Sequence, residues 1–305
     1  MKKIKFLIAG VILSSGLFAQ TTELESDVKE ASDTKKDGWK KGGVFTLTFS
    51  QTALSNWAAG GQNSISANGL LSLFGNYKKG NLTWDNNLDI GYGMLKNEGE
   101  DLRKSDDKIE LSSKVGKKAS EKWYYAAMLN FRTQMAEGLN FGSEAPYPKI
   151  SNALAPAYLI GAIGMDYKPS DQFTAFLAPL TGKITIVNDE DLSNAGAFGV
   201  DSGKVVRTEF GGYIRVAYTK PEVVKNVNFS TRLDLFSNYL NNPQNIDVNW
   251  ETLIAMKVNK FLTVNLTTHL IYDDDIAIIV DDKTGRTGKR VQFKEVLGVG
   301  FSYKF

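Results

Sequence analysis

Residues 82–94 read LTWDNNLDIGYGM, and their side chains alternate between apolar and polar with a period of two. One face of this segment is apolar at every position except Asn86. An α-helix would spread the apolar residues around its circumference, so the alternation predicts a β-strand. The segment is longer than the strands of soluble proteins, which typically have about five or six residues. It is also long enough to cross a membrane, for which a strand needs about nine to eleven residues.

The same alternation recurs along the chain and predicts an all-β fold of about twelve strands. Every second connection is short, whereas most of the others are longer, including 136–156, 188–202 and 274–288. Short turns at one end and long loops at the other are typical of outer-membrane barrels. The pattern therefore predicts a transmembrane antiparallel up-and-down β-barrel with both termini in the periplasm. The predicted strands are 43–55, 63–77, 81–95, 106–116, 122–135, 157–168, 172–187, 203–219, 226–240, 245–258, 260–273 and 289–305.

The last strand carries aromatic residues at alternate positions, namely Phe301, Tyr303 and Phe305. Aromatic side chains of barrels gather where the membrane meets water. This stripe is therefore expected on the lipid-facing end of a closing strand that pairs with the first strand near Phe45 and Phe49. We expect it to act in barrel closure and in recognition by the barrel-assembly machinery during insertion.

The chain starts like a secretory protein of a Gram-negative cell. Three of its first five residues are lysines, and an apolar stretch from Phe6 to Phe18 follows. This stretch is too short to span a bilayer as a helix, and the small residue Ala19 ends it, so cleavage after Ala19 is expected. A polar segment without periodicity comes next. The predicted organisation is 1–19 signal peptide, 20–41 flexible periplasmic lead-in and 42–305 outer-membrane β-barrel.

Composition excludes several functional classes. The chain contains no cysteine, which excludes disulfides, thiolate metal sites and cysteine nucleophiles. Its formal net charge is +2, so there is no electrostatic argument for a nucleic-acid partner. No cofactor motif is present, and we expect no cofactor.

The polar face of the strands is expected to line the lumen, and it carries both signs of charge. Buried charges are tolerated when they are paired or solvated, so they either fill a narrow lumen as ion pairs or line a small aqueous pathway. Mixed signs disfavour strong ion selectivity, and we favour a largely filled lumen. Glu295 is an exception, because it falls on the outward face between Phe293 and Leu297. A position near the upper rim, a register shift of the strand or, less readily, a partner contact would explain it. The predicted lumen charges are Asp85, Asp89, Arg132, Asp166, Lys168, Arg207, Glu209, Arg215, Arg232, Asp234, Glu251 and Lys257.

His269 is the single histidine and falls on the lumen face. Outer-membrane phospholipases with twelve strands place a serine close to their histidine on one strand, whereas Leu270 and Ile271 follow here. A hydrolase needs a nucleophile within hydrogen-bond reach of its base. We therefore expect a hydrogen-bonded lumen histidine and a protein that is not an enzyme.

The last long connection is acidic at its base and tip. Clustered carboxylates are possible calcium ligands, but the spacing matches no EF-hand, and basic residues follow at once. Opposed charges on two arms of a hairpin explain the pattern more simply, so no metal site is predicted. The weak calcium candidates are Asp273, Asp274, Asp275, Asp281 and Asp282.

Several short stretches of the sequence resemble those of an uncharacterised family of outer-membrane barrels, the domain of unknown function 3078. The resemblance implies a single-domain barrel and supplies no catalytic residues. The stretches are LSNWAAGG (54–61), APAY (155–158), GMDYKP (164–169), LFSNYL (235–240), NW (249–250) and YDDD (272–275).

Balanced lumen charges, the lack of a catalytic constellation and the long loops favour one hypothesis for the function. The chain is expected to be a structural or accessory subunit of a larger outer-membrane assembly, such as barrel-insertion or protein-export machinery. A channel or transporter for small solutes or apolar ligands is the alternative. The expected partners are outer-membrane lipid, the barrel-assembly machinery and outer-membrane proteins or lipoproteins.

Overall fold

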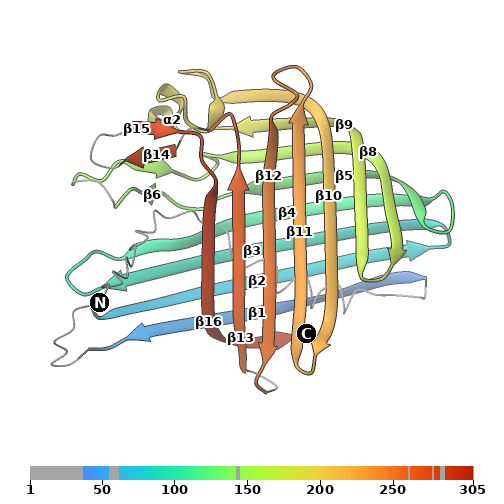
Figure 1. Ribbon diagram of the computed structural model, residues 1–305, viewed down its shortest axis with the longest axis horizontal. Helices are drawn as coiled ribbons and strands as arrows, with labels where there is room; N and C mark the ends of the chain where they lie inside the picture. The colour runs from blue at the N-terminus through green and yellow to red at the C-terminus, as the bar shows by residue number, and fades with distance from the viewer. Residues whose placement is uncertain are drawn as a thin grey trace, which may run out of the picture.

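The computed structural model describes residues 37–54, 62–141, 145–259, 262–276, 278–281 and 286–304. Within them, twelve strands form a closed antiparallel barrel (Figure 1). The prediction of an all-β barrel is confirmed, whereas the expected signal peptide and Phe305 lie outside the described residues. The barrel strands are β1 (Gly38–Thr52), β2 (Ser64–Lys79), β3 (Leu82–Asn97), β4 (Arg103–Lys118), β5 (Trp123–Thr133), β8 (Ala157–Ser170), β9 (Phe173–Ile186), β10 (Val206–Val224), β11 (Val227–Asn238), β12 (Ile246–Lys257), β13 (Leu262–Tyr272) and β16 (Gln292–Lys304).

The barrel closes between its first and last strands, as the aromatic stripe predicts. β16 pairs with β1 from Val44 opposite Lys304 to Phe49 opposite Val299. Phe301 and Tyr303 are exposed on the outer wall. β1 begins at Gly38, four residues before the expected start of the barrel at 42, because its backbone pairing with β2 continues beyond the apolar alternation.

The outer wall is apolar because the strands keep their alternation through the barrel. In β3, Trp84 and Tyr92 are exposed outside, whereas Asp89 is buried inside. Aromatic rings gather near the short turns: Trp39 lies 5.3 Å from Tyr77 and 5.6 Å from Trp84, measured between ring centroids. An apolar wall with aromatic residues at its border matches a hydrocarbon layer and its interface. No helix among the described residues is long and apolar enough to cross a membrane.

β9 interrupts its alternation near Pro179. The pairing of β9 shifts between Ile163 and Met165 of β8 and between Gly211 and Tyr213 of β10. Such a bulge adds a residue to one strand and moves the following side chains to the other face. Lys183 is consequently buried inside the barrel. A side chain at Gly164 would overlap the carbonyl oxygen of Leu177, so the glycine permits the close approach of β9.

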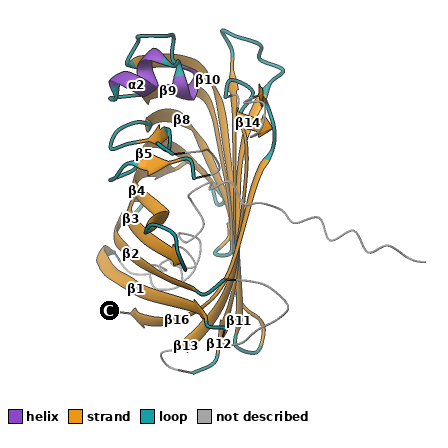
Figure 2. Cartoon of the chain, turned by 90° about the vertical axis from the view of Figure 1, so that its left-hand side faces the viewer, coloured by secondary structure: helices purple, strands orange, loops and turns teal. Residues whose placement is uncertain are grey.

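Long connections carry additional structure at one end of the barrel, where Figure 2 shows α2 and β14. The connection 98–102 is shorter than expected, because β3 continues to Asn97 and β4 begins at Arg103. Leu192 and Val200 of the β9–β10 connection pack against Ala155 of the β5–β8 connection. The two connections therefore form one packed layer. The additional elements are β6 (Gly138–Leu139), β7 (Lys149–Ser151), α2 (Glu190–Asn194), η1 (Ala197–Gly199), β14 (Ile278–Asp281) and β15 (Arg286–Gly288).

Candidate functional site

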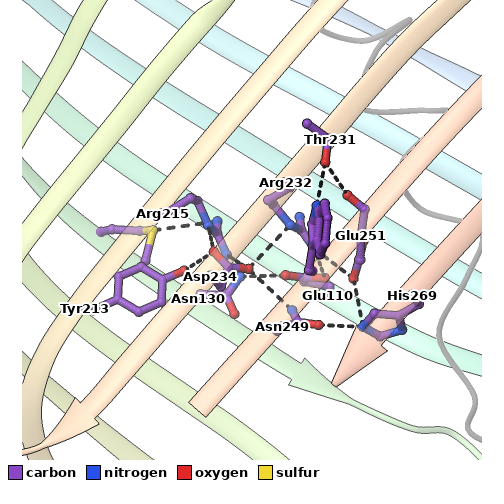
Figure 3. Close-up of polar contacts among 12 residues, drawn as sticks. Glu110, Asn130, Tyr213, Arg215, Thr231, Arg232, Asp234, Asn249, Glu251 and His269 are labelled. Atoms are coloured by element: carbon purple, nitrogen blue, oxygen red, sulfur yellow. Dashed lines mark hydrogen bonds and ion pairs between the residues drawn. The ribbon is translucent and has the colours of Figure 1, made fainter. Parts of the chain in front are cut away.

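Ion pairs cross the lumen near the middle of the barrel (Figure 3). Lys108 on β4 lies 2.6 Å from Glu110 and 3.8 Å from Glu251 on β12. Arg232 on β11 lies 3.1 Å from Glu251 and 3.6 Å from Glu110. Since β4 is not a neighbour of β11 or β12 in the barrel order, these contacts join opposite walls. We call Lys108, Glu110, Arg232 and Glu251 the central ion cluster.

Further polar groups extend the central ion cluster along β10 and β11. Arg215 donates from Nε to Asp234 at 2.6 Å, and the Tyr213 hydroxyl donates to the same carboxylate at 2.6 Å. Arg232 Nε lies 3.5 Å from Asp234. The guanidinium of Arg215 also reaches the sulfur of Met128 on β5 at 3.8 Å. These side chains thus hold one another in place within the lumen.

His269 belongs to this interior network. Its Nε2 lies 2.5 Å from Asn249 Oδ1 and 3.7 Å from Glu251. The side chain is buried, and the contacts with an amide and a carboxylate are those of a packed polar residue. That the protein is not an enzyme stays a prediction.

A second group of ion pairs lies toward the long loops. Lys183 on β9 binds Asp247 of β12 at 2.8 Å and approaches Glu209 at 3.4 Å and Asp273 at 3.9 Å. Arg207 binds both Glu209 and Asp275. The contact between Lys183 and Asp247 again joins strands that are not neighbours. The contacts of Asp273 and Asp275 attach the start of the last long connection to the barrel interior.

A third group lies toward the short turns, beside a cavity of about 500 Å³. Lys114 binds Asp166 at 2.6 Å, and Lys168 lies 3.3 Å from Asp166 and 3.6 Å from Asp85. Arg232 of the central ion cluster is part of the cavity wall. The cavity therefore borders the central ion cluster at Arg232.

The structure places the predicted lumen charges on inward-facing positions of their strands, with Asp89 bonded to Ser72 and Lys257 exposed at the end of β12. Sequence reasoning missed several inward residues. On β4, the outward residues Ile109 and Leu111 could have revealed them, whereas the bulge in β9 hid Lys183. The missed residues are Lys108, Glu110, Lys114, Lys183 and Asp247.

The acidic stretch does not gather into one site. Asp274 accepts from Lys289 at 2.7 Å and from Tyr272 at 2.9 Å, and these bonds hold the pKa of Asp274 below its usual value. Asp273 and Asp275 contact the cations Lys183 and Arg207 instead. Among the described residues, no three acidic or histidine side chains could share a metal. The side chain of Asp281 and all of Asp282 lie outside the described part.

A polar contact joins two of the long connections. Lys149 binds Asp189 at 2.7 Å and Asp191 at 2.8 Å, and Asn152 donates to Asp189 at 2.9 Å. Asp189 also caps α2 by accepting from the amide of Leu192. The hydrogen bonds from Asn152 and Lys149 lower the pKa of Asp189 to about 2.

Acidification is expected to release this contact. A free aspartate has a pKa of about 3.9, so the depressed value means that the stabilisation is complete above about pH 4 and is lost as the pH falls through about 2. Hydrogen exchange of the Leu192 amide, corrected for the intrinsic rate, should accelerate over this window. Asp189→Asn removes the titration and is the control. Constant protection of Leu192 from pH 5 to pH 2 would contradict the assignment.

These features define the class of the protein. A closed antiparallel barrel with an apolar, aromatic-bordered outer wall and a charged interior is an integral β-barrel of the outer-membrane class. Residues 49–139 match the model of the family described as "Protein of unknown function (DUF3078)". The family resemblance is thereby confirmed over these residues.

Solved structures with a similar arrangement include proteins of several activities. An outer membrane channel from Pseudomonas putida F1 is 11% identical, with 90% of this chain and 97% of that chain covered and a TM-score of 0.42. The translocator domain of the autotransporter NalP from Neisseria meningitidis is 11% identical (94% and 100% covered, TM-score 0.40). Outer membrane phospholipase A from Escherichia coli is 9% identical (91% and 96%, TM-score 0.36). No curated protein matches the sequence. These likenesses concern the fold alone.

Proposed function

We propose that this barrel is a non-enzymatic structural or accessory subunit of a larger outer-membrane assembly, with both termini in the periplasm. The observation that carries the proposal is the central ion cluster, in which Lys108 and Glu110 of β4 meet Arg232 and Glu251 of the opposite wall. An open diffusion pore needs a continuous aqueous path, and ion pairs that join opposite walls of the lumen oppose such a path, which supports the proposal. Packed outer loops and an apolar wall are the surfaces that remain for contacts.

The partners in this proposal are membrane-embedded or membrane-attached. Lipid surrounds the apolar wall, and the barrel-assembly machinery acts on the closing strand during insertion. Stable partners are outer-membrane proteins or lipoproteins that contact the wall or the loop layer. Isolation from native membranes in mild detergent, with mass-spectrometric identification of accompanying proteins, tests this directly. A lone monomer under these conditions would count heavily against an accessory role.

Conductance separates this role from that of a channel. The wild-type barrel is expected to show no steady current in a planar bilayer after insertion is verified. Lys108→Ser combined with Glu251→Ser removes one charge of each sign from the central ion cluster, and step conductance is expected. Lys149→Ser with Asp189→Ser is the matched control, because it removes an ion pair from the outer loops. Steady wild-type current would overturn the closed-lumen proposal.

The channel remains the second candidate because of the cavity of about 500 Å³ beside Lys114 and Lys168. A transporter would use this cavity as a binding chamber and would rearrange the central ion cluster to pass its solute. Solute-dependent current from the wild-type barrel would favour it.

A further inference from the structure

A row of polar side chains crosses the membrane-facing wall on four adjacent strands. Thr231 of β11 pairs with Thr252 of β12, Thr252 pairs with Thr268 of β13, and Thr268 pairs with Glu295 of β16. These strands lie side by side in the front wall (Figure 1). All four side chains lie on outward positions, and we call them the wall polar row.

Apolar residues border the wall polar row on both sides, which places the row inside the lipid-facing belt. Phe293 and Leu297 flank Glu295 and are 58% and 66% exposed. Leu266 and Leu270 flank Thr268 on β13 in the same way. A carboxylate in such surroundings is unfavourable unless something satisfies its charge.

The two ends of the wall polar row differ in their bonding. At one end, Thr231 exchanges a hydrogen bond of 2.9 Å with Thr252 and accepts from Trp250 Nε1 at 2.8 Å. At the other end, the carboxylate of Glu295 has neither an ion pair nor a hydrogen bond within the described residues. The row therefore ends in Glu295, whose carboxylate has no cation beside it among the described residues.

A polar group without a bonding partner is not the rule on the outer surface, because polar residues on the opposite wall bond to one another. There, Trp84 Nε1 donates to Ser113 at 2.9 Å, Ser113 donates to Asn86 at 2.8 Å, and Asn86 donates to the carbonyl of Gly75 at 2.9 Å. This chain of bonds ends on a backbone acceptor and needs no partner.

Glu295 also lies on a strand edge that lacks a neighbour in the described part of the chain. β16 pairs with β13 from Gln292 to Phe301, but its pairing with β1 begins only at Val299. Backbone groups from Gln292 to Gly298 on that side therefore have no partner strand among the described residues. The position of Glu295 in the wall is therefore fixed by β13, through its pair with Thr268.

From these observations we infer that the wall polar row forms the docking surface for a second, different outer-membrane barrel, which presents a lysine or arginine to Glu295 within the membrane. The inference rests on the proposed role as a subunit of an assembly. The row extends over four adjacent strands, an extent that suits contact with the wall of another barrel. A charge-assisted hydrogen bond to Glu295 would satisfy the exposed carboxylate.

A second copy of this chain fits less well. A two-fold interface places the same patch on both subunits, and Glu295 is the one ionisable residue of the wall polar row. With the two-fold axis beside Glu295, two carboxylates would meet in a medium of low dielectric constant, where like charges repel strongly. With the axis through the middle of the row, each Glu295 would face the threonine end of the other row, so neither arrangement supplies a cation.

Photo-crosslinking in native membranes tests the inference. Benzoylphenylalanine replaces Leu297 beside Glu295 or, as the control, Leu129 on the opposite wall, which is also exposed. The expected result is an adduct with one outer-membrane barrel at position 297 that is absent at position 129. Glu295→Lys should reduce the adduct at least tenfold, with unchanged membrane levels of the folded barrel. Changing the contacting basic residue of the cross-linked partner to glutamate should restore it.

Each contrary outcome has a distinct meaning. No adduct above the position-129 background, or an adduct insensitive to Glu295→Lys, overturns the docking surface. An adduct between two copies of this chain overturns the assignment to a different barrel. If an outer-membrane protein still accompanies the Glu295→Lys barrel through isolation at wild-type levels, the surface is wrong while the proposed accessory role stands.

Discussion

Glu251→Ala is expected to lower the free energy of unfolding by about 3–5 kcal/mol, because removal of one partner from a buried ion pair leaves an uncompensated charge. Arg232 and Lys108 approach this carboxylate at 3.1 Å and 3.8 Å, and all three side chains are buried. Urea titration of the folded barrel in lipid vesicles, followed by tryptophan fluorescence, measures the change.

The matched control is the double variant Glu251→Leu with Arg232→Met. It removes one charge of each sign and leaves Lys108 paired with Glu110 at 2.6 Å. Replacement of a buried ion pair by apolar residues of similar volume is often neutral or stabilising. The double variant should therefore unfold at higher urea than Glu251→Ala. Equal or lower stability of the double variant would show that the charges of the central ion cluster do not act as a pair.

Gly164→Ala is expected to prevent folding or to cost more than about 4 kcal/mol, the range reached when an added group forces strain in a packed structure. A Cβ at Gly164 would overlap the carbonyl oxygen of Leu177 and lie 2.6 Å from the Cα of Ala178. Both atoms belong to the backbone of the β9 bulge and cannot move aside like a side chain. Heat-modifiable migration on gels measures the folded fraction, and urea titration measures its stability.

Gly161→Ala is the control on the same strand. No atom lies within 4 Å of a Cβ at Gly161, and alanine loses less backbone entropy than glycine on folding, by about 0.5–1 kcal/mol. This variant should fold at wild-type levels with unchanged or slightly higher stability. Similar effects of the two substitutions would mean that the close approach of β9 to β8 does not decide the stability of this wall.

Strand positions could be predicted where lipid and lumen demand opposite side chains at successive residues. β3 and β11–β13 show the cleanest alternation and lie where it places them. The start of β1 could not be predicted, since Gly38–Lys41 pair through their backbone without an apolar pattern. The short elements in the long connections were likewise missed, because local packing and turns form them without periodicity.

For the candidate residues, the sequence largely predicted which side chains face the lumen, but it did not predict which of them contact one another. The outward position of Glu295 follows from its place between Phe293 and Leu297, but its alignment with Thr268 in the wall polar row depends on the register between β13 and β16. Lys183 was hidden because the bulge near Pro179 reverses the alternation. The acidic residues 273–275 follow one another in sequence, yet they contact three different cations.

The alternation of side chains alone decides that this chain is a membrane-spanning barrel with an apolar exterior and a balanced charged interior, since successive residues of a regular strand face opposite sides. Which charges meet is decided by the closed barrel. The tilt and register of the strands determine which residues of opposite walls share a level, and so only the tertiary structure brings Lys108 and Glu110 to Arg232 and Glu251.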